Sequence, residues 1–381
     1  MKERNLLLGK DLRYSRLVWC QILIIISLLI KPVSPAAASA PQLTADAAIL
    51  MDYRTGQVLY SNHATQQRPP ASTTKILTAL LGLELGSKKE IAAVSRNASR
   101  TGGASLSLRE GDSFYLNDII KGALISSGND AAAAIAEHIG GNRELFACLM
   151  NYKARVIGAS RSQFFNPHGL PCPGHHATAY DLALITRYAL KNKDFQEIVK
   201  TRTGTIRELK TGSLILLSNT NRLLWSKYRD LQVIGVKTGT TSEAGQCLVA
   251  AAEHKGRTLI SVVLHSHDRY ADTLNLLNYG FRKCHWFKIA KGEPLLALPV
   301  WNGKFSAVGV GPDADFEFPV NPEQLPFLER RVRLEPFLKA PFKAGTKAGT
   351  LEIFLKERLL FKTDLVTLTA VPRQNWFKKG V

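Results

Sequence analysis

The sequence predicts an α/β fold, in which an antiparallel sheet carries a helical subdomain, followed by a small all-β C-terminal domain. Three observations favour this fold. β-type runs lie after residue 44 and again after residue 214, helical periodicity fills the stretch between them, and short β-type runs with glycine turns follow residue 290. Because 381 residues suit two domains and a processed leader, we expect the boundaries 1–40, 41–290 and 291–381.

The first forty residues have the pattern of a signal peptide. Five basic residues precede an apolar run from Leu17 to Ile30, and Ala38-Ser39-Ala40 offers the small residues that a signal peptidase needs. We predict cleavage after Ala40 and export to the periplasm, the cell wall or the outer face of the cytoplasmic membrane. An uncleaved anchor helix is the alternative, although the run is short for a bilayer.

The chain is strongly basic. Its formal net charge is +19, of which the leader, with six basic and two acidic residues, carries +4. The basic residues are scattered, and no zinc-finger spacing or RNA-binding aromatic motif accompanies them, so we do not expect a nucleic-acid partner. An anionic wall or membrane surface suits this charge in an exported protein, and a solvated basic surface without a partner is the alternative.

Four cysteines follow the leader, at positions 148, 172, 247 and 284. They form no C-x-x-C pair and have no histidine at metal-ligand spacing, so we predict no metal and no cofactor. Cys148 and Cys247 lie in apolar runs, which favours buried thiols. Their redox state stays open, because an exported protein permits disulfides.

The first predicted elements are strands over 47–51 and 57–60, which form a hairpin. A helix follows over 72–85, with Ser72 at its start. Between residues 116 and 140 we expect two helices separated by the polar break Ser126-Ser127-Gly128-Asn129. The middle of the chain is therefore helical.

Two further helices are predicted over 178–190 and 268–283. Between them, Val233 to Val236 leads into Lys237, and the runs 246–253 and 257–265 flank a Lys-Gly turn as neighbouring antiparallel strands. These strands complete the sheet that the first hairpin begins. The short β-type runs with glycine turns beyond residue 290 predict the separate all-β domain.

Ser72-Thr73-Thr74-Lys75 is an S-x-x-K motif at the start of the first predicted helix. Residues three apart share a helix face, so the hydroxyl and the amine are within mutual reach. A serine needs a base to take its proton, and a lysine in a desolvated site can do this as the neutral amine. The motif alone is weak, because average Ser and Lys usage yields about one or two matches in a chain of this length, and alone it would indicate a helix cap.

Two copies fit S-x-N, at Ser95-Arg96-Asn97 and at Ser127-Gly128-Asn129. The second lies in the break between two apolar helices, where its hydroxyl and amide are held rigidly. The first lies in a polar stretch, so we interpret Ser95 as a surface residue and favour Ser127 and Asn129.

K-T-G also occurs twice. The copy at 210–212 lies between two hairpin arms, so Lys210 is interpreted as a solvated turn residue. The copy at 237–239 continues an apolar strand, and Gly239 would let a substrate backbone approach the strand edge. Lys237 then supplies positive charge for a substrate carboxylate and for proton transfer through Ser127.

In this order, S-x-x-K, S-x-N and K-T-G are the motif set of penicillin-binding proteins and serine β-lactamases. The chain resembles the low-molecular-mass D-alanyl-D-alanine carboxypeptidases, peptidase family S11, along its mature length. The stretches 48–52, 56–60, 166–170, 178–183 and 237–245 carry the resemblance besides the motifs. It implies a serine β-lactamase/D,D-peptidase-like domain that removes the terminal D-alanine from peptidoglycan stem pentapeptides, with β-lactam antibiotics as acylating inhibitors.

The resemblance also implies roles for individual residues. Ser72 is the nucleophile, Lys75 accepts its proton, and Ser127 relays a proton to the leaving D-alanine. The backbone N–H groups of Ser72 and Thr240 form the oxyanion hole. The implied substrate-binding residues are Asn129, which also holds Lys75, with Lys237, Thr238, Gly239, Thr240 and Arg269. For Arg269, a surface role at a helix start is the alternative.

Other functions in the same superfamily stay open. A class A β-lactamase needs a glutamate after S-x-N, and none lies between Glu144 and Glu197, so β-lactamase activity is expected to be weak at most. A D,D-endopeptidase and a catalytically inactive wall-binding relative are further alternatives. His168 is interpreted as a loop-shaping residue, because Lys75 already serves as the base.

Two features depart from the family pattern. Thr240 stands where some relatives have a histidine. Only residues 372–381 follow the last predicted strand, which is short for an amphipathic membrane helix, although they include Trp376, Phe377, Lys378 and Lys379. Peripheral contact with the membrane or the anionic wall is therefore left open.

Overall fold

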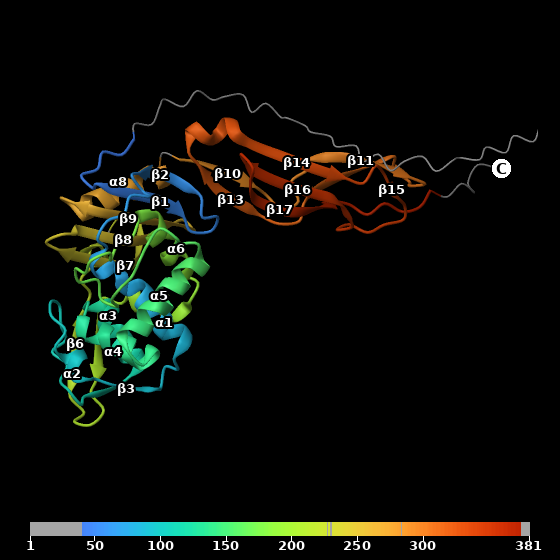
Figure 1. Cartoon of the computed structure of the whole chain (residues 1–381). Coiled ribbons are helices and arrows are strands. Elements are labelled where there is room, and N and C mark those ends of the chain that lie inside the picture. The colour runs from blue at the N-terminus through green and yellow to red at the C-terminus, as the bar shows by residue number, and fades with distance from the viewer. Residues whose placement is uncertain (1–39, 227, 229–230, 283, 375–381) are drawn as a thin grey trace, which may run out of the picture. The chain divides into compact units, whose positions relative to one another are not determined.

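A five-stranded antiparallel sheet organises the first part of the chain in the computed structural model, which describes residues 40–226, 228, 231–282 and 284–374 (Figure 1). Its strand order is β2-β1-β9-β8-β7. The strands are β1 (Ala47–Asp52), β2 (Val58–Asn62), β7 (Gln232–Thr241), β8 (Gly245–His254) and β9 (Arg257–Ser266). The predicted signal peptide, up to residue 39, lies outside the described residues.

Both faces of this sheet are covered. Helix α8 (Arg269–Arg282) packs on one face, where Gly280 allows a close approach, since a Cβ there would lie 2.5 Å from Leu259 Cδ1. Helices α6 (Ala179–Ala189) and α1 (Lys75–Leu85) lie against the other face (Figure 1). All six residues of β1 are buried, which explains the unbroken apolar run from Ala47 to Met51.

A helical layer extends from the second face of the sheet and forms the predicted helical subdomain. Helix α4 runs through its centre, and its alanines 131–134 are fully buried, so neighbouring helices approach closely. Polar caps fix where helices begin: Asn142 accepts the N–H of Leu145, and Thr178 accepts that of Asp181. Besides α1 and α6, its helices are α2 (Arg96–Ser99), α3 (Leu116–Ile125), α4 (Asn129–Gly140), α5 (Arg143–Ile157) and α7 (Lys193–Lys200).

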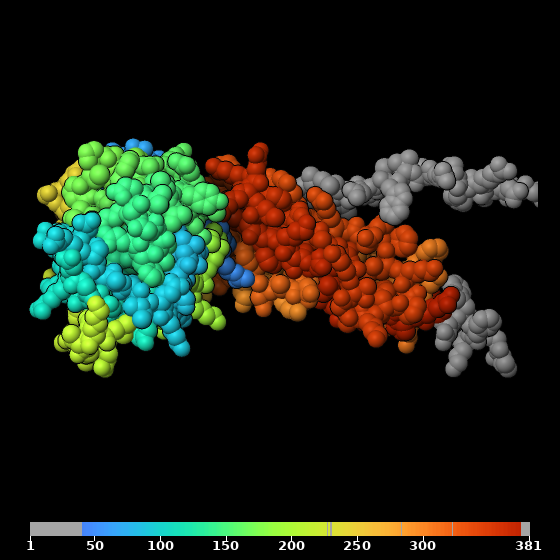
Figure 2. All heavy atoms as spheres, turned by 60° about the horizontal axis from the view of Figure 1, so that its bottom comes forward, coloured from blue at the N-terminus to red at the C-terminus, as the bar shows by residue number. Residues whose placement is uncertain are grey.

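Short strands and turns complete this unit. The pair β3 (Ile91–Ala93) and β4 (Ser113–Tyr115) lies beside the helices. A hairpin of β5 (Thr203–Arg207) and β6 (Leu214–Ser218) projects from the helical layer and forms the yellow-green lobe in Figure 2. Two 3₁₀ turns, η1 (Ala71–Thr74) and η2 (Arg222–Leu224), flank the sheet strand β7 in space.

The C-terminal residues form the predicted all-β domain, which confirms the fold class. Its six-stranded sheet has the order β14-β16-β17-β12-β11-β15 and is antiparallel except where β11 meets β15. The strands are β11 (Leu296–Trp301), β12 (Ala307–Pro312), β14 (Leu328–Leu334), β15 (Leu338–Lys339), β16 (Lys347–Leu355) and β17 (Arg358–Thr367).

The described chain divides into two compact units, one of residues 40–287 with 317–325, and one of residues 288–316 with 326–374. The strands β10 (His285–Ile289) and β13 (Phe316–Val320) pair with each other at the points where the chain changes unit. The return of 317–325, which includes the 3₁₀ turn η3 (Pro322–Phe327) in part, is a feature that no sequence pattern predicts. No helix of the described residues has the length and apolar character that a membrane span requires.

All four cysteines of the described chain have free thiols. Cys247 is buried as expected, and so is Cys284. The prediction of a buried Cys148 was wrong: this residue is exposed, because it lies on the outer face of α5 while Phe146 and Met150 face the core. The apolar run around it belongs to an amphipathic helix with only one buried face.

Candidate active site

Ser72 lies in the 3₁₀ turn η1, directly before α1, and lines a cleft of about 890 Å³. Lys75 is the first residue of α1, and its Nζ lies 2.9 Å from Ser72 Oγ. The predicted pairing of hydroxyl and amine is therefore present. The other described residues that line the cleft are Ala104, Ser126, Ser127, Thr220, Arg222, Thr238, Gly239, Thr240, Gln246, His267, Asp268, Arg269 and Tyr270.

Lys75 is fully buried and has three polar neighbours. Besides Ser72 Oγ, its Nζ donates to Asn129 Oδ1 at 2.6 Å and to the backbone carbonyl of His168 at 2.9 Å. Burial lowers the pKa of Lys75 well below its usual value, nearby Lys237 lowers it further, and Asp130 opposes the shift. A neutral amine has two N–H groups, and both have acceptors here, so its lone pair is directed at Ser72.

Asn129 begins α4 and is held by its own contacts. Its Nδ2 donates to the carbonyl of Gly102 at 2.6 Å, which leaves Oδ1 facing Lys75. The next residue, Asp130, is buried and accepts the backbone N–H groups of Leu106 and Leu108. Asp130 thus fixes the loop beside the site, a role that sequence reasoning missed because it depends on a loop more than twenty residues away.

Ser127 occupies the predicted break between α3 and α4. Its φ of 67° lies in the left-handed region, which is uncommon for a residue other than glycine. The side chain is buried against the wall of the cleft. Ser72, Lys75, Ser127 and Asn129 therefore come together from η1, α1 and the α3–α4 break, as the sequence predicted.

Lys237 lies on β7 and is only 1% exposed. Its Nζ donates to the carbonyl of Thr238 at 3.0 Å. Burial lowers the pKa of Lys237 to about 7, and the positive charge of Arg269 contributes. The positive charge of Lys237 in turn lowers the pKa of Lys75, which favours the neutral form of Lys75.

Gly239 packs closely against the turn that carries Ser72. A Cβ at this position would lie 3.0 Å from Ala71 Cβ and 3.0 Å from the backbone nitrogen of Ser72. Gly169 is similar, because a Cβ there would lie 1.8 Å from the carbonyl oxygen of Ala71. The turn that carries Ser72 therefore packs closely on both glycines. Gly239 also lines the cleft, so the approach of a substrate backbone to this position stays a prediction.

Arg269 begins α8 and is tied to two strands. Its guanidinium donates to the carbonyls of Gly239 at 2.8 Å and Cys247 at 3.1 Å, to Thr240 Oγ1 at 2.8 Å and to Gln246 Oε1 at 3.2 Å. These contacts connect β7 to β8 at the edge of the cleft. The sequence predicted that Arg269 lies near the site, but not that it forms hydrogen bonds with both β7 and β8.

His168 lies beside Lys75 without a free basic nitrogen directed at the substrate. Its carbonyl accepts from Lys75, and its Nδ1 accepts the N–H of Leu170 at 3.2 Å. Burial and the charge of Lys75 lower the pKa of His168 to about 3, so the ring is neutral. These contacts fit the predicted loop-shaping role.

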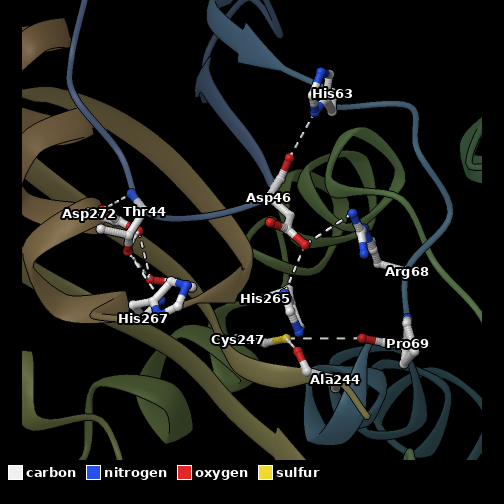
Figure 3. A network of polar contacts seen from close by, with 11 residues as sticks. Thr44, Asp46, His63, Arg68, Pro69, Ala244, Cys247, His265, His267 and Asp272 are labelled. Atoms are coloured by element: carbon white, nitrogen blue, oxygen red, sulfur yellow. Dashed lines mark hydrogen bonds and ion pairs between the residues drawn. The ribbon is translucent and has the colours of Figure 1, made fainter.

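A polar network connects the N-terminal segment to the start of α8 (Figure 3). Asp272 is buried and accepts from the backbone and the hydroxyl of Thr44, each at 2.9 Å, and from Ser266 Oγ at 2.6 Å. The carboxylate of Asp46 pairs with Arg68 at 3.0 Å and with His265 at 2.8 Å. Arg68 precedes Ser72 by four positions. Its ion pair with Asp46 therefore anchors the segment of chain that leads into the turn of Ser72.

The alternative motif copies lie outside the cleft. Ser95 is the N-cap of α2, where it accepts the N–H of Ala98 and donates to Glu137, so it is a half-buried cap and not the free surface residue that we expected. Lys210 is exposed in the β5–β6 turn, as predicted. Among the described residues, no three His, Cys, Asp or Glu side chains are grouped closely enough to hold a metal ion.

Two protein families match this chain, one over each part of the fold. Residues 34–268 match the family described as D-alanyl-D-alanine carboxypeptidase, and residues 288–373 match the family described as penicillin-binding protein 5, C-terminal domain. The chain is 34% identical to D-alanyl-D-alanine carboxypeptidase DacC of Escherichia coli strain K12, over 89% of this chain and 87% of the relative.

Two further similarities cover nearly the whole chain. DacD of Salmonella typhimurium is 31% identical, over 94% of this chain and 96% of the relative. The solved structure of penicillin binding protein 6B from Escherichia coli superposes with a TM-score of 0.66 at 28% identity, over 87% of this chain and 98% of that one. The similarity therefore includes both units of the fold.

Proposed function

This chain belongs to the S11 family of D-alanyl-D-alanine carboxypeptidases, and from that premise we propose how its residues perform the family reaction. It is a serine-type carboxypeptidase that removes the terminal D-alanine from peptidoglycan stem pentapeptides and is sensitive to penicillin. The observation that carries the residue assignment is the 2.9 Å contact between Ser72 Oγ and the buried amine of Lys75.

Acylation begins when Lys75 Nζ takes the proton of Ser72 and Oγ attacks the carbonyl carbon between the two D-alanines. The acceptors Asn129 Oδ1 and the carbonyl of His168 occupy the two N–H groups of the neutral amine. The remaining lone pair is then available only to the serine. The lowered pKa of Lys75 favours its neutral form, which suits this step.

The negative charge of the tetrahedral intermediate is stabilised by the backbone N–H groups of Ser72 and Thr240. The close packing of Gly239 on the nitrogen of Ser72 supports this assignment, because it brings β7 directly against the nucleophile turn. Ser127 then passes a proton to the leaving nitrogen as the C–N bond breaks. Water hydrolyses the resulting ester and regenerates Ser72.

The substrate carboxylate is bound on the β7 side of the cleft. Lys237 supplies positive charge beneath it, and Thr238 and Thr240 present hydroxyl groups beside it. Asn129 holds the substrate amide in addition to Lys75. These contacts fix the scissile bond over Ser72.

The test is a labelled penicillin, which forms a covalent adduct with the nucleophile of these enzymes. We expect mass spectrometry to place the adduct on Ser72 and Ser72→Ala to remove it without changing the thermal unfolding midpoint. Release of D-alanine from a pentapeptide by purified protein separates the enzyme from an inactive wall-binding relative, and product analysis separates carboxypeptidase from endopeptidase. Label retained by Ser72→Ala would sink the assignment.

We also propose the cellular placement and domain limits given by the sequence. Residues 1–40 direct export and are removed, and 41–290 and 291–381 act as the catalytic and C-terminal domains outside the cytoplasm. The mature protein should therefore begin at Pro41. Mass spectrometry of the intact protein from the producing cell tests this cleavage point, and a mass that includes the leader contradicts it.

Peripheral contact with the membrane or wall is proposed for the C-terminal domain. Trp301 and Phe305 are 58% and 54% exposed, and Phe337 packs edge-on against Trp301 at 5.7 Å. Lys339 lies over the Trp301 ring at 5.8 Å, so aromatic and cationic groups lie together as they do at lipid interfaces. Trp301→Ala with Phe305→Ala should weaken sedimentation with phosphatidylglycerol vesicles, and unchanged binding contradicts the assignment.

A further inference from the structure

His175 is a buried histidine that the proposed mechanism does not use. It lies in the loop 164–176, between α5 and α6, and is 7% exposed. Its Nε2 lies 3.1 Å from the hydroxyl oxygen of Thr74, a residue 101 positions earlier in the chain. Thr74 is fully buried, is the last residue of the 3₁₀ turn η1 and directly precedes Lys75. A side chain from a distant loop therefore contacts the turn of the nucleophile beside the proposed base.

The hydrogen bonds of the His175 ring identify the nitrogen that carries the proton. Nδ1 accepts the backbone N–H of Phe165 at 3.1 Å. A neutral imidazole has one N–H donor and one acceptor nitrogen, so the proton lies on Nε2 and is donated to Thr74 Oγ1. Burial lowers the pKa of His175 to about 4, and the charge of His176 contributes, so the ring is neutral at physiological pH.

Both ring nitrogens are thus engaged within the chain. His175 also lines a second hollow of about 560 Å³, together with residues that include Arg68, His176 and Glu243. No ring nitrogen is left to bind a ligand there or to exchange a proton with the substrate. The ring is held by packing as well, edge-on to Phe164 with 5.7 Å between the centroids. This arrangement fits a positioning role and not an acid–base one.

The loop that carries His175 is attached to the nucleophile region at two further points. Lys75 Nζ donates to the carbonyl of His168 at 2.9 Å, and Thr78 Oγ1 donates to the carbonyl of Pro167 at 2.6 Å. In both bonds the loop contributes a backbone carbonyl, which a side-chain substitution in the loop does not remove. The bond from His175 comes from a side chain, so a substitution removes it by itself.

The turn and the loop pack closely against each other. A Cβ on Gly169 would lie 1.8 Å from the carbonyl oxygen of Ala71 and 2.8 Å from Thr74 Oγ1. Because Ser72 lies between Ala71 and Thr74 in the same short turn, a shift of Thr74 also moves the nucleophile. Such a shift slows a reaction, since the reacting groups must meet within narrow limits of distance and angle.

We infer that His175 is a positioning residue for the reaction: its Nε2–H holds Thr74 and thereby fixes Ser72 and Lys75 relative to the loop that supplies the His168 carbonyl. The inference rests on the proposed function, because it concerns the geometry in which Lys75 takes the proton of Ser72. His175 does not line the cleft, so its loss should slow acylation and leave substrate binding nearly unchanged.

Two amide side chains separate the roles of the two ring nitrogens. The side-chain nitrogen of glutamine reaches the position of Nε2, whereas the asparagine side chain reaches only that of Nδ1. His175→Asn keeps an acceptor for Phe165 and loses the donor to Thr74, so we expect acylation by penicillin to slow about 10-fold. His175→Gln restores the donor and should acylate at close to the parent rate. His176→Asn is the matched control and should not change the rate, because this half-buried neighbour contacts the carbonyl of Gly174 through its Nδ1.

Thr74→Val removes the same bond from the side of the turn and keeps the shape of the side chain, so it should slow acylation by a similar factor. The double variant of Thr74→Val with His175→Asn should be no slower than the slower single variant, because both act through one contact. For D-alanine release, kcat should fall in these variants while KM stays within about twofold of the parent. A role in stability alone would lower the unfolding midpoint without lowering kcat of the folded enzyme.

Equal slowing in His175→Asn and His175→Gln, additive losses in the double variant, or an unchanged rate in Thr74→Val overturn the inference. Thr74→Val also provides the test if His175→Asn does not fold. The proposed function is independent of these results as long as the unsubstituted enzyme forms the penicillin adduct on Ser72 and releases D-alanine. If it does neither, the proposed function fails, and the positioning role of His175 fails with it.

Discussion

The two K-T-G copies of this chain have the same three side chains in opposite environments. Lys210 is exposed in the turn of the β5–β6 hairpin, whereas Lys237 is 1% exposed on β7. Gly212 has one atom near a would-be Cβ, Arg207 Nη1 at 4.0 Å, and a φ of +73°, the conformation that a tight turn needs. Gly239 has the nucleophile turn against it, at 3.0 Å from a would-be Cβ to the nitrogen of Ser72.

The threonines differ in the same way. Thr211 donates to Glu208 Oε2 at 2.8 Å and stabilises the turn, while Thr238 contacts Thr220 on the wall of the cleft. Burial lowers the pKa of Lys237 to about 7. The comparison teaches that the motif supplies only the residue types. Burial and the neighbouring elements supply the chemistry, so each substitution at 237–239 has an internal control at 210–212.

Lys237→Met should have the largest effect. In the proposed mechanism it removes the positive charge that binds the substrate carboxylate, and we expect kcat/KM for D-alanine release to fall by about 10²- to 10³-fold. Lys210→Met removes the same charge from the surface and should leave kcat/KM within about twofold of the parent. Steady-state kinetics on one pentapeptide provide both values. Similar losses in the two variants would show that the comparison does not separate catalytic from structural copies.

Gly239→Ala should have the next largest effect. The new methyl group meets Ala71 Cβ and the nitrogen of Ser72 at 3.0 Å, so the nucleophile turn must shift by a few tenths of an ångström. A misplaced nucleophile lowers the rate, and we expect about a 10- to 100-fold slower acylation by penicillin. Gly212→Ala meets only Arg207 Nη1, at an ordinary contact distance of 4.0 Å, but strains the turn at positive φ, so it should lower the unfolding midpoint without slowing acylation. Unchanged acylation in Gly239→Ala contradicts the proposed packing.

Much of the fold follows from the sequence because each element carries its own periodicity and caps. The runs around Ile49, Val249 and Val262 are apolar on both faces and appear as buried strands. Helix α8 was expected to start at Asp268 and starts at Arg269. Residues 317–325 were not predicted to return to the first unit, since nothing local in a sequence records which distant segment it packs against.

In the site, too, residues in local motifs were predicted and residues that act through distant contacts were not. Ser72, Lys75, Ser127 and Asn129 were found because they lie in short motifs with fixed spacing. Asp130, by contrast, was missed because its carboxylate binds the backbone of Leu106, which lies in a loop that is distant in the sequence.

The hydrogen bonds of Arg269 depend on acceptors from two strands, β7 and β8, so only coordinates reveal that its guanidinium is engaged.

The pH dependence of stability sharpens the comparison further. The pKa of Lys237 is lowered to about 7 in the folded protein, against about 10.4 in an unfolded chain. Between these values the unfolded chain holds a proton that the folded protein lacks at this residue, so the free energy of unfolding rises with pH. Lys237→Met should lose this contribution and Lys210→Met should keep it. Thermal midpoints measured from pH 7 to pH 10 test this, and parallel curves for the two variants contradict the burial argument.

Thr211→Val should have the smallest effect, because it acts on the structural copy alone. The hydroxyl donates to Glu208, whose pKa is lowered to about 2 chiefly by backbone N–H groups of Thr211 and Ser113. Valine removes one contact of this turn, worth ~1 kcal/mol, so the midpoint of the catalytic unit should fall by about 2–4 °C. Thr205→Val, an exposed position of the same hairpin, is the control and should not lower it. The rate of D-alanine release should stay unchanged in both, because the hairpin contributes no residue to the cleft lining. A slower rate in Thr211→Val would connect the exposed copy to catalysis and remove the distinction between the two.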